Sequence, residues 1–85
     1  MNKRDEIISQ ISEVASAFYK NKNNEAIKAT PDLVRKIAGV LKNNEKNATV
    51  MHNLLEAYEQ KEYVMVADIL SYEVAKLIED KETAR

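Results

Sequence analysis

His52 is the only histidine in the chain, and Glu56 follows it four residues later on the same face of an expected helix. An imidazole and a carboxylate at this spacing could serve as two adjacent metal ligands. A metal site needs three or four ligands, however, and the sequence has no second histidine, no Glu-x-x-His pattern and no cysteine. His52 also falls off the apolar stripe of its helix. We therefore expect a solvent-facing histidine, with no metal or other cofactor bound.

The acidic residues of the second half could form catalytic pairs. They are Glu56, Glu59, Glu62, Asp68, Glu73 and Glu79. A catalytic pair needs a pocket that removes one carboxylate from water and shifts its pKa, whereas these acids are spaced as solvated charges on helix surfaces. Asp68 is a partial exception because it lies beside apolar Ala67 and Ile69. We expect an exposed acid between the two apolar faces, with a pair to a Lys or Arg across an interface as the alternative.

Motifs for nucleophilic catalysis and phosphate binding are missing from the sequence. None of the four serines has a histidine placed to activate it, and no Gly-x-Ser-x-Gly turn occurs. One glycine in the whole chain cannot build a phosphate-cradling loop. We predict that the chain is not an enzyme.

Length and composition favour one small helical domain over residues 1–85. Apolar residues make up 45% and charged residues 32%, and Gly and Pro occur once each, which favours helices joined by short polar loops. No apolar run approaches the roughly 20 residues of a membrane span, and no signal-peptide core is found, so we expect a cytoplasmic protein that does not bind membranes.

The charge is unevenly distributed along the chain. Residues 1–47 carry 9 Lys/Arg and 6 Asp/Glu, whereas residues 48–85 carry 4 and 8. A scattered excess of this size does not make the dense basic patch that nucleic-acid binding needs, so we expect no nucleic-acid partner. The asymmetry fits two halves that attract each other, within one chain or across a dimer, or two solvated surfaces without a role.

Apolar spacing predicts four helices, at about 5–20, 24–42, 45–59 and 62–80, with Asn23 or Asn24 as N-cap of the second. We interpret them as an antiparallel, up-and-down four-helix bundle. Pro31 removes the hydrogen bond to the carbonyl of Ile27, so the second helix is expected to be kinked there. The alternative is a short helical turn followed by a new helix capped by Thr30.

The connection at residues 59–62 contains neither Gly nor Pro. The apolar stripe of the third helix includes Leu54, Leu55 and Tyr58, and it does not continue into the stronger stripe that begins at Tyr63. We therefore predict a tight turn near Gln60–Glu62, with one continuous helix over residues 45–80 as the alternative. The charged tail after Asp80 is expected to fray.

The last helix is apolar on two opposite faces. One stripe contains Tyr63, Val66, Ala67, Leu70, Val74, Leu77 and Ile78. Met65, Ile69 and Tyr72 fall on the other side of the same helix. A surface helix of a monomer needs only one apolar face. The pattern therefore predicts a homodimer in which Met65, Ile69 and Tyr72 form the interface.

The segment Leu54–Glu73 resembles one found in small, uncharacterised all-helical proteins of bacteria. The residues that carry the resemblance are Leu54-Leu55-Glu56-Ala57, Lys61-Glu62-Tyr63-Val64, Ala67-Asp68 and Tyr72-Glu73. The resemblance implies a helix–turn–helix unit near Lys61 and supplies no activity. On architecture alone, the chain is also similar to flagellar export chaperones of the small helical-bundle kind.

These patterns lead to one functional expectation and one alternative. We expect a non-catalytic protein–protein interaction module that self-associates through the outer face of its last helix. The alternative is a small helical chaperone or adaptor that shields a helix of a client protein. A closed homodimer would hide the second apolar face, whereas an adaptor would leave it free to bind an amphipathic peptide.

Overall fold

The chain is all-α over the residues that a computed structural model describes, which are 3–80, 83 and 84. Helices occupy four stretches of these residues: α1 (Lys3–Tyr19), α2 (Asn23–Val40), α3 (Glu45–Glu59) and a last stretch made of α4 (Tyr63–Asp68), η1 (Ile69–Val74) and α5 (Ala75–Glu79). The predicted all-helical class is confirmed, and every helix end lies within two residues of its predicted position.

The last stretch is one continuous helix with a wide turn in its middle. Ile69 and Ala75, at the two junctions, both have right-handed helical backbone angles. Within η1 the hydrogen bonds span five residues, as in the bond from the N–H of Ala75 to the carbonyl of Leu70. We refer to α4, η1 and α5 together as the last helix. The sequence pattern did not predict its π-helical turn.

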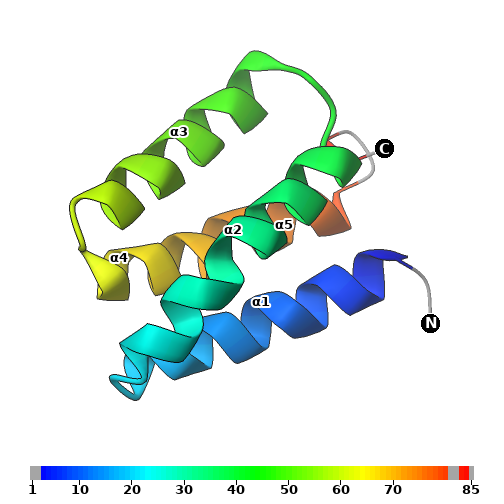
Figure 1. Cartoon of the computed structure of the whole chain (residues 1–85). Coiled ribbons are helices and arrows are strands. Elements are labelled where there is room, and N and C mark those ends of the chain that lie inside the picture. The colour runs from blue at the N-terminus through cyan, green and yellow to red at the C-terminus, as the bar shows by residue number, and fades with distance from the viewer. Residues whose placement is uncertain (1–2, 81–82, 85) are drawn as a thin grey trace.

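The last helix lies between α1 and α3 (Figure 1). It packs against α1 along α4, η1 and α5, and against α3 along α4 and η1, while α2 packs mainly on α1. The fully buried core contains Phe18, Leu33, Leu54, Leu70 and Ile78, so every helix contributes to it. Both apolar sides of the last helix thus find neighbours within one chain.

Two tight turns of the same type connect α1 to α2 and α3 to α4. In the first, Asn21 has φ of 62°, and the N–H of Lys22 donates to the carbonyl of Ala17. In the second, Lys61 has φ of 61°, and the N–H of Glu62 donates to the carbonyl of Ala57. Both have the Schellman pattern, in which a left-handed residue ends a helix. The predicted turn at residues 60–62 is confirmed, and one continuous helix over residues 45–80 is wrong.

The first turn also corrects the predicted cap of α2. Because Lys22 completes the Schellman turn, α2 begins at once with Asn23, and no side-chain hydrogen bond caps it. An asparagine cap is found instead at α3, where the side chain of Asn44 accepts from the N–H of Asn47 at 2.8 Å.

Pro31 lies inside α2, which runs through it as a single helix. A proline has no N–H to donate to the carbonyl of Ile27. The hydroxyl of Tyr58 on α3 donates to that carbonyl at 3.1 Å. One residue earlier, the hydroxyl of Thr30 donates to the carbonyl of Ala26 at 2.7 Å. A side chain of a neighbouring helix therefore satisfies the acceptor that proline leaves open. The alternative of a new helix starting at Thr30 is wrong.

Thr83 and Ala84 lie against the loop that connects α2 to α3. The carbonyl of Thr83 accepts from the N–H of Lys42 and from Nδ2 of Asn47, both at 2.8 Å. The hydroxyl of Thr83 donates to the carbonyl of Leu77 at 2.7 Å, and Ala84 is buried. The prediction that the charged tail frays is therefore wrong for Thr83 and Ala84. Residues 81, 82 and 85 lie outside the described part of the chain.

Candidate interaction surfaces

His52 lies on the solvent side of α3, as its position off the apolar stripe predicts. Its Nε2 is 3.3 Å from a carboxylate oxygen of Glu56, and both side chains are more than half exposed. Among the described residues, no group of three or more His, Cys, Asp or Glu side chains is placed to hold a metal ion. The pair is therefore a surface contact one helical turn apart, of small energetic weight.

The three residues of the predicted interface do not share one exposed face. Met65 and Tyr72 are 49% and 65% exposed, but Ile69 is only 6% exposed and belongs to the core. Ile69 lines a shallow hollow of about 300 Å³ next to Asn53 and Ala57 of α3. The prediction that Ile69 lies outside the core is wrong, because α3 packs on that side of the last helix.

The π-helical turn separates Ile69 from Tyr72. A turn with five-residue hydrogen bonds rotates less per residue than an α-helical turn, so residues three apart diverge further around the axis. Ile69 accordingly faces α3, whereas Tyr72 lies near Tyr19 of α1.

Four exposed large apolar side chains lie on α1 and the last helix, and they are Tyr19, Val64, Met65 and Tyr72. Met65 lines the hollow beside Ile69 and α3, whereas Tyr72 lies near Tyr19. Val64, Asp68 and Tyr72 follow each other at four-residue intervals along the last helix, and the hydroxyl of Tyr19 donates a hydrogen bond to Asp68. We call Tyr19, Val64 and Tyr72, with Asp68 among them and Met65 at the edge toward α3, the outer face. Only Leu55 among the other described large apolar side chains is comparably exposed.

The contact between Tyr19 and Asp68 gives the outer face its main electrostatic feature. The hydrogen bond to the carboxylate of Asp68 raises the pKa of Tyr19 to about 12, with partial burial and the negative charge of Asp68 adding to the effect. Tyr19 is 45% exposed, so water screens this interaction. Asp68 is exposed, as expected, and its hydrogen-bond partner is a tyrosine of the same chain, not the basic residue that the alternative gave it.

A second apolar surface lies between α2 and α3. Its lining residues form a hollow of about 370 Å³ and are Thr30, Pro31, Val34, Leu55, Tyr58 and Glu59. A further hollow of about 280 Å³, lined in part by Ala38 and Met51, lies nearer the loop between the two helices. We call the two hollows together the α2–α3 groove. Leu55 is 42% exposed in it, so its predicted inward position is wrong.

The sequence contained signals for two features that were not predicted, the exposure of Leu55 and the place of Val64 on the outer face. Leu54 and Leu55 are adjacent, and neighbours on a helix point about 100° apart, so one of the two had to leave the centre of the buried face. Val64 precedes Asp68 and Tyr72 at helical spacing. We call the hydrogen bond from Nδ2 of Asn47 to the carbonyl of Thr83 the clamp. No local sequence pattern predicts it, because it joins residues 36 positions apart.

No helix in the described part of the chain is long and apolar enough to cross a membrane. In comparisons with known proteins, no family model, curated protein or solved structure matches the chain. The resemblance of Leu54–Glu73 to small helical bacterial proteins thus stays a prediction.

Proposed function

We propose that this chain is a small, non-catalytic protein–protein interaction module that forms a homodimer through the outer face. The observation that carries the proposal is the exposure of Tyr19, Val64 and Tyr72 around Asp68, with Met65 at the edge toward α3. These four are among the five exposed large apolar side chains of the described residues. Contiguous exposed apolar surface rimmed by polar groups marks binding sites in small proteins, and tyrosine and methionine suit such sites. Met65 and Tyr72 remain in the proposed interface, and Ile69 supports it only from the core.

The proposed contact is two-fold, because the same face then serves both copies. Val64 and Tyr72 lie on either side of Asp68 along the helix. The carboxylate of Asp68 already accepts a hydrogen bond from Tyr19 of its own chain, which lowers the cost of bringing this charge toward an interface. The proposed setting is the cytoplasm, and the proposed chain arrangement is an antiparallel, up-and-down bundle with α2 bent at Pro31.

Light scattering coupled to gel filtration, over a range of concentrations, tests the homodimer. Met65→Glu and Tyr72→Glu are expected to yield monomers with unchanged circular dichroism. Leu55→Glu is the matched control, since Leu55 is 42% exposed against 49% for Met65 but lies on another surface. A native chain that stays monomeric at every concentration, or a dimer unaffected by both outer-face changes, contradicts the proposal.

Ile69→Lys is unsuitable as an interface variant. Ile69 is 6% exposed and packed beside α3, so a lysine there would bury a charge and unfold the chain, whatever its oligomeric state.

A further inference from the structure

The α2–α3 groove has an apolar floor and rims of opposite charge. Pro31, Val34, Leu55 and Tyr58 supply most of the floor, and Leu55 is exposed within it. A concave apolar strip between two helices is the kind of surface into which an amphipathic helix packs. The hydrogen bond from Tyr58 to the carbonyl of Ile27 joins the two walls across the floor and fixes their separation.

The rim on α2 is basic. Lys28 and Arg35 lie seven residues apart on α2 and are exposed, and Lys42, just beyond the end of α2, is exposed and lines the second hollow. Arg35 lies one turn beyond floor residue Pro31 and directly after floor residue Val34, which places it at the edge of the groove. The acid nearest to Arg35, Asp32 at 3.9 Å, also contacts Lys36 at 3.3 Å, so α2 keeps an excess of positive charge.

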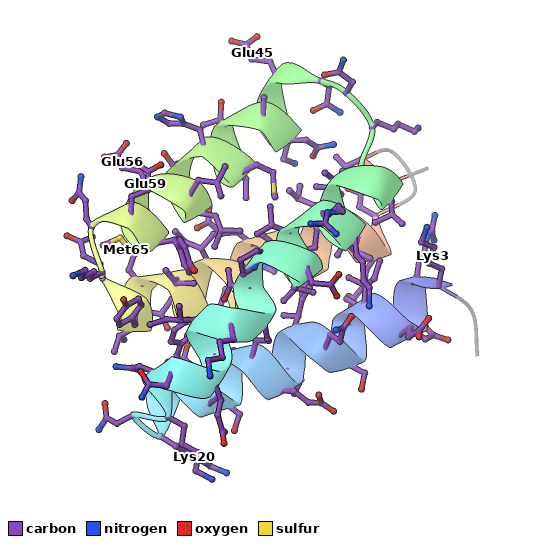
Figure 2. All side chains as sticks on the ribbon, in the orientation of Figure 1. Lys3, Lys20, Glu45, Glu56, Glu59 and Met65 are labelled. Atoms are coloured by element: carbon purple, nitrogen blue, oxygen red, sulfur yellow. The ribbon has the colours of Figure 1, made fainter. Side chains whose placement is uncertain are left out.

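The rim on α3 is acidic. Glu45, His52 and Glu59 also follow each other at seven-residue intervals and are exposed, and Glu59 itself lines the groove. Glu45, Glu56 and Glu59 project outward from α3 in Figure 2. Lys46 is the only Lys or Arg of α3, against Glu45, Glu56 and Glu59.

The seven-residue spacing on both rims points to a helix as the occupant. Seven residues make two helical turns, about 10.5 Å, so each rim repeats at the interval at which a docked helix repeats its own side chains.

We propose that the α2–α3 groove binds an amphipathic helix of a partner protein, with an acidic flank of that helix against α2 and a basic flank against α3. The apolar stripe of the partner packs on Val34, Leu55 and Tyr58, and its flanks meet Arg35 and Glu59. The proposal is independent of the homodimer, because the groove and the outer face share no residue.

A labelled synthetic peptide provides the probe. It has about 18 residues, enough to span the length of α3, with leucines at heptad a and d positions, glutamates on one flank and lysines on the other. Fluorescence anisotropy with the full chain is expected to show saturable binding that weakens with salt. A peptide of the same composition with scrambled order is expected not to bind. Absence of binding by the patterned peptide overturns the proposal.

Variants then locate the site. Leu55→Glu is expected to abolish peptide binding, and Met65→Glu, of similar exposure, is expected to leave it unchanged. The double variant Lys28→Glu/Arg35→Glu is expected to weaken binding about tenfold, and a peptide with lysines on both flanks is expected to restore it. Because these rim side chains are exposed, circular dichroism should confirm that the variants keep the native helix content.

Three results contradict the proposed site. The first is peptide binding to the Lys28→Glu/Arg35→Glu variant as tight as to the native chain. The second is peptide binding that is lost in Met65→Glu and kept in Leu55→Glu, and the third is peptide-induced amide chemical shift changes confined to the outer face. A change in mass of Leu55→Glu by light scattering, with Met65→Glu unchanged, assigns the groove to self-association and also overturns the proposal. A failed homodimer with intact peptide binding leaves it standing.

Discussion

The contact between Tyr58 and the carbonyl of Ile27 predicts an energetic coupling with Pro31. Tyr58→Phe removes a hydrogen bond of 3.1 Å and leaves that carbonyl without a donor, because residue 31 has no N–H. An unsatisfied buried acceptor costs about 1–3 kcal/mol. Ile27 and Tyr58 are only half-buried, so water recovers part of this loss. We expect Tyr58→Phe to lower the free energy of unfolding by about 1–1.5 kcal/mol.

The same change should cost less when residue 31 is alanine. Pro31→Ala supplies an N–H to the carbonyl of Ile27 and removes the clash of the proline ring, for which we expect a gain of about 1–2 kcal/mol after the greater freedom of the unfolded chain is subtracted. With the main-chain bond restored, Tyr58→Phe should cost about 0.5 kcal/mol or less. The coupling in the double-mutant cycle is then about 0.5–1 kcal/mol.

Equilibrium unfolding in urea, read by circular dichroism, measures the four corners of this cycle. Tyr63→Phe is the control, because the ring of Tyr63 stacks on Phe18 with centroids 5.2 Å apart and does not bond to Ile27. The effects of Tyr63→Phe and Pro31→Ala on the free energy of unfolding should add. If the effects of Tyr58→Phe and Pro31→Ala also add, Tyr58 does not replace the missing donor and the reasoning fails.

Three further predictions follow from the turns, the clamp and the outer face. Asn47→Ala removes the bonds to the carbonyls of Lys42 and Thr83 and should lower the unfolding free energy by about 2 kcal/mol. The amide of Ala84 should then lose its protection from hydrogen exchange, and retained protection would contradict the clamp. Lys61 has a left-handed backbone that glycine adopts without strain, so Lys61→Gly should raise the free energy of unfolding in urea by about 0.5–1 kcal/mol. Asn21→Gly should raise it less, since asparagine tolerates this conformation. A loss of stability in Lys61→Gly would contradict this reasoning. The raised pKa of Tyr19, about 12 against 10, means that the folded chain holds this proton more tightly, so its contribution is complete below about pH 10 and lost as the pH rises through about 12. Asp68→Asn should lower that pKa in an ultraviolet titration, and an unchanged curve would remove Asp68 as its cause.

The positions of the helices could be predicted from sequence because each element carries its own periodic signal. The helix predicted at 45–59 is α3, Glu45–Glu59, and the change of phase near Lys61 located a turn that has no Gly or Pro. The side on which each neighbour packs was not predictable in this way. The exposure of Leu55 and Tyr19 depends on where α2 and the last helix lie, and a helical stripe alone does not fix this.

The candidate surfaces were predictable only in part, for the same reason. A wide apolar circumference on the last helix correctly indicated two neighbours, but both are supplied by α1 and α3 of one chain. Met65 and Tyr72 were located correctly as exposed, whereas Ile69 was not. The groove is lined by Pro31 of α2 and Tyr58 of α3, and Tyr58 bonds to the carbonyl of Ile27 on α2. Sequence periodicity does not predict which residues of two different helices come together.

The two apolar sides of the last helix therefore imply something different from what the sequence first indicates. They place that helix between α1 and α3, which leaves only part of its circumference free to bind. Its remaining exposed strip contains Val64, Met65 and Tyr72, interrupted by Asp68. The one other exposed large apolar side chain of the described residues, Leu55, lies on α3 in the groove shared with α2. A second binding surface is thus expected between α2 and α3, where an additional helix would complete the packing that the last helix already has.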